Sequence, residues 1–173
     1  MACLKAREGV GLSLPSYVED ALEGALVCLF TTVNERGEPV THPMLPLYRR
    51  GSGIIYFTSS ILFSRKLEHI KKNPRVSLLF PGGELSRSDI RDIVQVKGLA
   101  SVKDEDLHDG WTFLLPLWRA KEPYIDRYLK QRFALPLFWE RAAIEVRPVK
   151  LSVWREGDLS REPEEIEVGE GRP

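Results

Sequence analysis

The residues best suited to chemistry in this sequence stand at the start of one predicted helix, in Ser64-Arg65-Lys66. A serine there can cap the helix, because its hydroxyl accepts a hydrogen bond from a free N–H of the first turn. Arg65 and Lys66 then take the first helical positions, where the helix dipole disfavours cations by roughly 0.3–1 kcal/mol each. Free N–H groups, dipole and cations would all converge on a phosphate bound there. A solvated helix start with two basic side chains is the alternative.

A second candidate lies in the strand predicted at residues 39–50, in His42-Pro43-Met44-Leu45. Two prolines of this strand, Pro43 and Pro46, each remove a backbone donor, which places the strand at a sheet edge or a bulge. The backbone groups left unpaired could bind a flat, partly polar ring system while Met44 and Leu45 pack beside it. An edge strand protected against aggregation is the alternative.

Two more side chains could line a pocket. Gln95 is flanked by Val94 and Val96 and therefore points to the opposite face of its strand. Its amide offers both a donor and an acceptor to a heteroaromatic edge. Trp154 closes the last predicted strand, where an indole can stack on a ring or cover the core. The alternatives are that Gln95 is an outward-facing strand residue and that Trp154 is a core residue.

The sequence lacks the familiar metal-binding and catalytic motifs. Its histidines, His42, His69 and His108, show no ligand spacing, and its two cysteines, Cys3 and Cys28, do not join them. We expect no metal site, with His69 and His108 at the surface and Cys28 in the core. A Gly-x-Ser-x-Gly elbow, a P-loop and a dinucleotide glycine fingerprint are also missing, so the catalytic residues stay unassigned.

The composition indicates one globular domain, with 173 residues of which 43% are hydrophobic and 29% charged. The 25 basic and 25 acidic residues give a net charge of zero, which argues against a nucleic-acid partner. The longest apolar run is too short to span a membrane, and the N-terminus has no signal-peptide pattern. We therefore expect a cytoplasmic protein without a membrane partner.

Strands dominate the predicted elements. Six are expected, at residues 25–33, 39–50, 54–58, 75–80, 93–102 and 142–154. Short connections between the first three favour an antiparallel meander, and six strands with few helices favour a closed or nearly closed barrel. Within the fifth strand, Gly98 predicts a bulge or a close backbone approach. The predicted class is mainly β, or α+β, with flanking helices.

The predicted helices flank these strands. Ser16 and Glu19 have capping-box spacing at the start of the first helix, and Gly24 is placed to end it. Residues 104–140 form a helical region rich in aromatics and leucines, whose apolar surface could cover a barrel end or a partner subunit. The acidic tail, residues 156–173, has no apolar period and is expected to be flexible or lightly packed.

Taken together, these segments resemble the FMN-binding split barrels of the pyridoxamine 5'-phosphate oxidase family. The resemblance covers most of residues 20–155. Its most specific parts are Phe57-Thr58, Ser64-Arg65-Lys66 and Asn73-Pro74-Arg75-Val76-Ser77-Leu78-Leu79-Phe80, with further matches in residues 25–47, Gln95-Val96, Gly98 and Val146-Arg147-Pro148 to Trp154. It implies a six-stranded antiparallel split β-barrel domain over residues 1–155, followed by the acidic tail.

The resemblance also implies FMN held at a two-fold homodimer interface. Arg65 and Lys66 would grip the phosphate, with Ser64 beside them and Thr58 bonding the cofactor from a strand end. The residues implied to line the isoalloxazine or ribityl chain are His42, Pro43, Met44 and Leu45. Gln95 and Trp154 would complete the pocket from the other subunit.

Two departures from the family concern its substrate. The family's Arg-Leu-His-Asp-Arg motif is absent after Trp154, where Arg155-Glu156-Gly157-Asp158-Leu159-Ser160-Arg161 stands instead, and the family's arginine of the second strand is His42 here. The resemblance thus implies an FMN-dependent oxidoreductase acting on an unassigned small molecule, with flavin N5 as hydride carrier. A non-catalytic flavin- or haem-binding module and a deazaflavin-dependent reductase are the alternatives.

Overall fold

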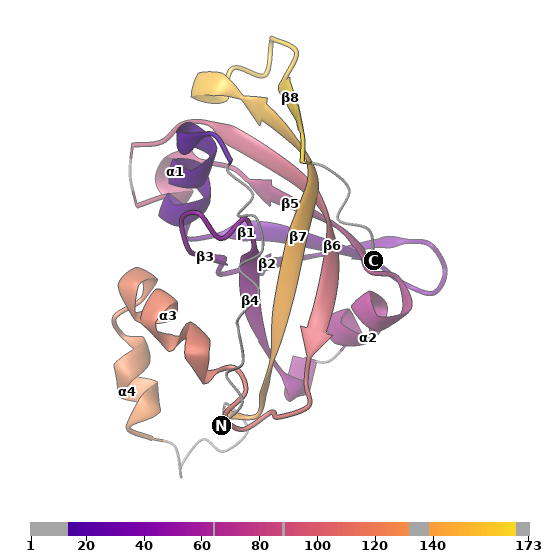
Figure 1. The fold of residues 1–173 in the computed structure, drawn as a ribbon, viewed down its shortest axis with the longest axis vertical. Coiled ribbons are helices and arrows are strands. Elements are labelled where there is room, and N and C mark those ends of the chain that lie inside the picture. The colour runs from indigo at the N-terminus through magenta and orange to yellow at the C-terminus, as the bar shows by residue number, and fades with distance from the viewer. Residues whose placement is uncertain (1–13, 64, 88, 132–138, 169–173) are drawn as a thin grey trace, which may run out of the picture.

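The computed structural model describes residues 14–63, 65–87, 89–131 and 139–168. These residues form one curled antiparallel sheet with short helices around it. In Figure 1 the long strands β6 and β7 run through the middle of the molecule, with α2 to their right and α1, α3 and α4 to their left. The predicted antiparallel split barrel with flanking helices is confirmed.

The sheet has the strand order β2-β1-β5-β6-β7-β4-β3, and β8 pairs with β7 outside this path. All paired neighbours are antiparallel. The bounds are β1 Cys28–Val33, β2 Pro39–Met44, β3 Leu47–Tyr48, β4 Ile55–Ser60, β5 Arg75–Phe80, β6 Ile93–Lys103, β7 Arg141–Trp154 and β8 Glu164–Glu167.

The predicted number of six strands is wrong, because the part of the chain that the structure describes contains eight. The single strand expected at residues 39–50 is divided at Leu45 and Pro46 into β2 and β3. Pro46 has no backbone N–H to continue the ladder. The two resulting strands end the sheet path at opposite edges, so this short link joins both edges of the curled sheet.

The acidic tail supplies the other additional strand, where we expected flexible or lightly packed chain. Strand β8 pairs with β7 over Glu164 to Glu167. Its Ile166 packs against the barrel core, and the adjacent Val168 is itself buried in that core. The expectation failed because pairing to β7 depends on contacts distant in sequence, which a charged tail does not reveal.

The helices are short. Their bounds are α1 Ser16–Gly24, α2 Arg65–Lys72, α3 Leu115–Lys121 and α4 Ile125–Leu129, with 3-10 turns at Ile61–Phe63, Gly83–Leu85, Thr112–Leu114 and Arg155–Gly157. The first helix ends at Gly24 as predicted, but its predicted capping box is wrong. Pro15 stands at the N-cap, where no side chain caps the helix. The Glu19 carboxylate does not reach back to the helix start, because it turns inward and accepts hydrogen bonds from Tyr48 and Gly51.

Two apolar clusters hold the fold together. The first fills the barrel, where the rings of Phe30 and Phe57 meet edge to face with centroids 4.9 Å apart. Cys28 belongs to this cluster and is fully buried, as predicted. The second lies on the other face of β4 and β7 and joins the sheet to the predicted helical region through Trp111 and Trp139.

Strand β6 carries the bulge that Gly98 predicted. The register of β6 against β7 shifts between Lys97 and Gly98. A Cβ atom at Gly98 would lie 2.7 Å from the carbonyl oxygen of Arg147, so only glycine fits this approach of the two backbones. The bulge bends the long β6–β7 pair that spans the barrel.

Candidate functional site

The candidate site lies where β4 ends and α2 begins. Along β4, Ile55, Phe57 and Ser59 are buried on the side that faces the barrel interior. Thr58 alternates with them and lies on the opposite side of the strand, together with Tyr56 of the second apolar cluster. The turn Ile61–Phe63 links this strand to α2. Ser64, predicted to cap the helix, lies outside the described residues.

Lys66 turns back from α2 towards the strand end and is only 8% exposed. Its Nζ donates to Ser59 Oγ at 3.2 Å and to the Phe63 carbonyl oxygen at 3.2 Å. Both acceptors are neutral, and an ammonium has three donors, so one donor has no recorded acceptor in the described chain. Burial, followed by repulsion from Arg141, lowers the pKa of Lys66. An anion bound here would offset the cost of this buried charge.

Arg141 is a residue that the sequence interpretation missed. It begins β7 opposite Ser60, and its Nε and Nη2 donate to Thr58 Oγ1 at 3.2 and 3.0 Å. The guanidinium carbon lies 5.0 Å from the ring centroid of Trp118 and 5.8 Å from that of Trp111. Burial lowers the pKa of Arg141 to about 10. The only sequence signal is a charge placed directly before an apolar run.

His42 brings a third basic side chain to this region from β2, where it pairs with Phe30. Its Nε2 atom is buried and has no hydrogen-bond partner among the described residues. Burial is the largest cause lowering the pKa of His42, followed by the charges of Lys66 and His69. A buried polar atom without a partner costs about 1–3 kcal/mol, so a ligand that bonds it would relieve this cost.

The other predicted residues of these segments are placed differently. Arg65 is exposed at the first position of α2, and Pro43 is exposed on the edge strand β2. Met44 packs against the barrel core and Leu45 against the second cluster. Charge interactions thus link His42 to Lys66 and Lys66 to Arg141, which bonds Thr58, while Met44 and Leu45 contribute mainly to packing.

Gln95 and Trp154 lie at a different part of the sheet. Gln95 points away from its buried valine neighbours, as predicted, and its Nε2 donates to Ser77 Oγ at 3.3 Å. Thr58 pairs with Ala143 of β7, whereas Gln95 pairs with Ser152 of the same strand. Because a strand rises about 3.3 Å per residue, these two places are roughly 30 Å apart along β7. One chain alone does not bring the two groups together.

The remaining predicted histidines do not add to the site. His108 is exposed, as expected, whereas His69 is half-buried on α2 with its Nδ1 3.0 Å from Thr32 Oγ1. Across the described ranges, no group of three or more His, Cys, Asp or Glu is placed to hold a metal ion. In the same ranges, no helix is both long enough and apolar enough to cross a membrane.

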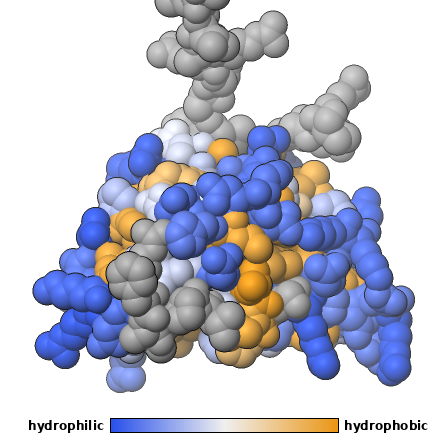
Figure 2. Space-filling view, turned by 90° about the horizontal axis from the view of Figure 1, so that it is seen from below, coloured by the Kyte–Doolittle hydropathy of each residue, from blue (hydrophilic) through white to orange (hydrophobic). Residues whose placement is uncertain are grey.

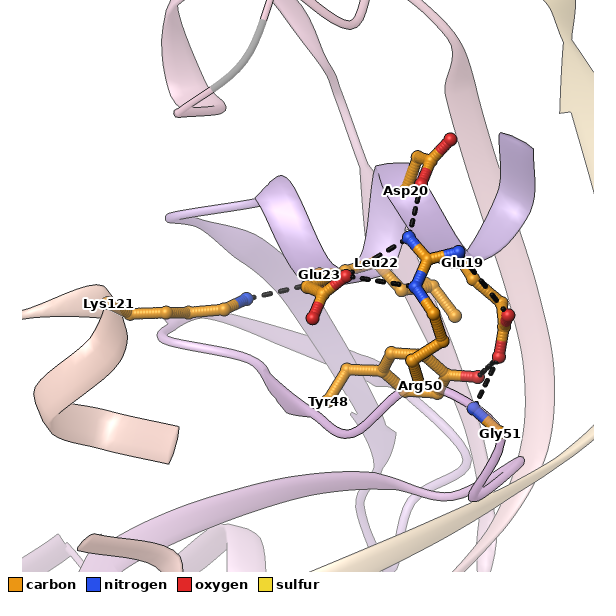
Figure 3. Close-up of polar contacts among 8 residues, drawn as sticks. All are labelled: Glu19, Asp20, Leu22, Glu23, Tyr48, Arg50, Gly51 and Lys121. Carbon is orange, nitrogen blue, oxygen red and sulfur yellow. Dashed lines mark hydrogen bonds and ion pairs between the residues drawn. The ribbon is translucent and has the colours of Figure 1, made fainter. Parts of the chain in front are cut away.

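A second polar cluster, shown in Figure 3, fastens α3 to α1. Lys121 is buried, and its Nζ donates to the carbonyl oxygens of Leu22 and Ala25 at 3.1 and 2.7 Å. Arg50 pairs with Asp20 and Glu23 on the outer side of α1. Since these charged groups have protein partners, we interpret the cluster as a structural joint.

The region around Thr58 and Lys66 fits a phosphate monoester. The ammonium of Lys66 bonds Ser59, the guanidinium of Arg141 bonds the hydroxyl of Thr58, and the two charges repel each other. His42 Nε2 is buried and has no hydrogen-bond partner among the described residues. Phosphate oxygens are acceptors only and carry the complementary charge. The fold and this site together define a split-barrel protein with a candidate phosphate site.

The family follows from the comparison with known sequences. The sequence model described as Pyridoxamine 5'-phosphate oxidase matches residues 14–155. The chain belongs to the pyridoxamine 5'-phosphate oxidase family.

Individual relatives share less with this chain. A pyridoxine/pyridoxamine 5'-phosphate oxidase of Pectobacterium atrosepticum is 41% identical over 56 residues, which are 32% of this chain and 24% of that protein. Curated relatives of this kind are thus matched over 24–33% of their own length.

Solved structures show the same fold at low sequence identity. An F420 reductase superposes with a TM-score of 0.55 at 23% identity, covering 78% of this chain and 94% of that one. A haem-binding protein of Mycobacterium smegmatis superposes with a TM-score of 0.59 at 13% identity, covering 89% of this chain and 59% of that one.

Proposed function

We propose that this protein is an FMN-binding flavoprotein and an FMN-dependent oxidoreductase that acts on a small molecule. The observation that carries the proposal is the buried ammonium of Lys66, held between two neutral acceptors with a further donor available. The Thr58 hydroxyl, bonded by Arg141, and the unpaired Nε2 of His42, whose pKa the charge of Lys66 lowers, are further polar atoms available to a ligand. Membership of the family supports FMN over an unrelated phosphate compound.

The proposed roles of the residues are those of binding and orientation. Lys66, with Arg65 and Ser64 next to it in sequence, would hold the phosphate, and Thr58 would bond it from the strand end. His42 would bond the cofactor through Nε2, with the backbone of Pro43, Met44 and Leu45 alongside. Bound FMN supplies hydride transfer at N5. No side chain of this region is assigned as a general acid or base.

We also propose a homodimer, because one chain does not complete the pocket. Gln95 and Trp154 lie near one end of β7, away from the Thr58–Lys66 region, so a second copy would have to supply them. Leu62 and Phe63, directly before the site, are 58% and 69% exposed. Figure 2, a view from below the molecule of Figure 1, shows hydrophobic residues at the surface between hydrophilic ones. Exposed apolar surface of this kind is typical of an interface.

Two other cofactors have specific support. The structural likeness to an F420 reductase favours the deazaflavin coenzyme, which also carries a phosphate. The likeness to a haem-binding protein, together with the unpaired Nε2 of His42, favours haem in a non-catalytic module. Flavin absorption bands and a Soret band separate FMN from haem, and the mass of the released cofactor separates FMN from deazaflavin.

The direct test of the phosphate assignment is Lys66→Met with FMN and riboflavin as ligands. We expect FMN affinity to fall by roughly 10- to 100-fold, the effect of losing one charged hydrogen bond, while riboflavin affinity stays nearly unchanged. Flavin fluorescence measures both. Lys71→Met is the matched control, because Lys71 is an exposed lysine of the same helix paired with Asp104. Equal affinity of Lys66→Met and the wild type for FMN would refute the assignment.

A further inference from the structure

The hydroxyl of Thr58 has an unusual set of partners. Its Oγ1 accepts two hydrogen bonds from one side chain, from Nε of Arg141 at 3.2 Å and from Nη2 of Arg141 at 3.0 Å. A threonine hydroxyl has two acceptor lone pairs and one O–H donor. Both lone pairs are therefore engaged, and the O–H must point elsewhere. Among the described residues no acceptor for this O–H is recorded.

The surrounding fold holds both Arg141 and Thr58 in place. The Arg141 backbone N–H donates to the Leu107 carbonyl oxygen at 2.8 Å, and its guanidinium lies over the rings of Trp118 and Trp111. Thr58 is β-branched, which restricts its χ1, and its backbone is paired with Ala143 in the ladder. The direction of the hydroxyl is thus set by the fold before a ligand arrives.

We infer that Arg141 is a positioning residue which fixes the Thr58 hydroxyl as a hydrogen-bond donor to a phosphoryl oxygen of the bound cofactor. The inference rests on the proposed function, and it assigns Arg141 a role at the same site. A hydroxyl whose lone pairs are filled can donate but not accept, so it selects an acceptor. A phosphate monoester offers acceptors only, and the nearby Lys66 supplies the charge that it needs.

Lysine is not an equivalent of arginine in this role. The planar guanidinium presents several N–H donors in a fixed fork and stacks on aromatic rings, whereas an ammonium is a point charge on a flexible stem. Arg141→Lys keeps the positive charge but loses the paired donation to Thr58 Oγ1. The variant therefore separates the contribution of charge from the contribution of geometry.

The test is a double-mutant cycle with Arg141→Met, Thr58→Val and the combined variant, plus Arg141→Lys. FMN and riboflavin are titrated against each protein by flavin fluorescence. We expect each single variant to weaken FMN binding roughly tenfold and riboflavin binding much less. The combined variant should bind FMN no worse than Thr58→Val, because Arg141 acts through Thr58. Arg141→Lys should remain close to Arg141→Met.

Several results would overturn the inference. Additive losses would mean that Arg141 contacts the ligand itself, and full FMN affinity in Arg141→Lys would mean that charge alone matters. Equal losses for FMN and riboflavin would indicate a structural role. Thermal unfolding of the apo proteins identifies a variant that fails to fold, in which case Thr58→Val and the conservative Thr58→Ser carry the comparison.

A wild-type protein that binds neither flavin would refute the proposed function, and a separate measurement then tests the inference. Inorganic phosphate is added during thermal unfolding of the wild type and of Arg141→Met. Stabilisation of the wild type that is lost in the variant supports a phosphoryl site organised by Arg141. Absence of stabilisation in the wild type, or the same stabilisation in both proteins, contradicts it.

Discussion

At the scale of single residues, the site is defined by basic groups that the fold buries. The ammonium of Lys66 lies against Ser59, the guanidinium of Arg141 against Thr58, and burial lowers the pKa of each. Repulsion from Arg141 adds to the free-energy cost of burying the Lys66 ammonium. Natural sequences tend to retain such costs at functional sites, where a ligand compensates them. Replacing a buried polar group that has no protein partner by an apolar one should therefore raise the stability of the apo protein.

His42 provides the clearest case for this expectation. Its Nε2 is buried without a partner, so His42→Phe removes an unsatisfied polar atom and retains a flat ring. We expect the free energy of unfolding of the apo protein to rise by about 1–2 kcal/mol, while FMN affinity falls. Denaturant unfolding and flavin titration measure the two effects.

The control for His42→Phe is Thr41→Phe, since the neighbouring Thr41 is exposed on the opposite face of β2. It should leave FMN affinity unchanged. A His42→Phe protein that is less stable and still binds FMN normally would show that Nε2 has a structural partner and no ligand.

At the scale of elements, the helical region is tied to the barrel by side chains as well as by the second apolar cluster. Lys121 of α3 donates to carbonyl oxygens at the C-terminal end of α1, where a cation is also favoured by the helix dipole. Arg87, from the segment after β5, bonds the Ala120 carbonyl oxygen of the same helix. These contacts bring three separate parts of the chain to one joint.

The Lys121 joint predicts a specific pH dependence of stability. Burial, opposed by Glu23 and Cys28 and aided by repulsion from Arg87, lowers the pKa of Lys121 to about 8, whereas an unfolded lysine titrates near ~10.4. Between these values the unfolded chain binds more protons than the folded chain. The free energy of unfolding should therefore rise with pH across this window, by about 3 kcal/mol at most.

Lys121→Met should abolish this contribution. Denaturant unfolding of both proteins between about pH 7 and pH 10 measures it. Subtracting the free energy of unfolding of Lys121→Met from that of the wild type at each pH cancels the contributions of groups that titrate in both proteins, such as Cys28. Parallel pH profiles for the wild type and Lys121→Met would contradict the assigned pKa shift.

Much of this element pattern follows from the sequence, because it depends on local signals. Apolar runs located the main strands, and Gly98 marked the bulge. The prolines of the strand predicted at residues 39–50 indicate an edge or a bulge, but its division into β2 and β3 follows from closure of the sheet. Strand β8 was missed because one isoleucine among glutamates gives no periodic signal.

The candidate site was predictable in part for the same reason. Lys66 and Thr58 lie in one short segment whose residue types already indicated a phosphate site. Arg141 was missed because it reaches Thr58 across the sheet from 83 residues further along the chain. The joint at Lys121 depends on separations of 96 and 99 residues. Contacts over such distances are set by strand pairing and helix packing, which local patterns do not fix.

At the scale of the whole molecule, the proposed pocket requires two copies of the chain. The Thr58–Lys66 region and the Gln95–Trp154 region are separated along β7, and an exposed apolar segment borders the first. A two-fold dimer uses the same surface on both subunits. It can therefore place the first region of each subunit against the second region of the other, which forms two equivalent pockets. Dimerisation and cofactor binding should therefore be coupled.

Phe63→Ser tests this coupling. We expect a shift from dimer to monomer in analytical ultracentrifugation, together with weaker FMN binding that recovers at higher protein concentration. Tyr124→Ser is the control, because Tyr124 is 60% exposed in the link between α3 and α4, outside both regions of the proposed pocket. A dimer that persists in Phe63→Ser with unchanged FMN affinity would place the interface elsewhere.

The most direct test of the account is the identity of the cofactor that the native protein carries. The protein is purified without added cofactor, its absorption spectrum is recorded, and the mass of the compound released on denaturation is determined. We expect flavin bands and the mass of FMN. A Soret band, or a released compound without a phosphate, would contradict the proposal that the buried Lys66 and the Thr58 hydroxyl held by Arg141 form a phosphate site.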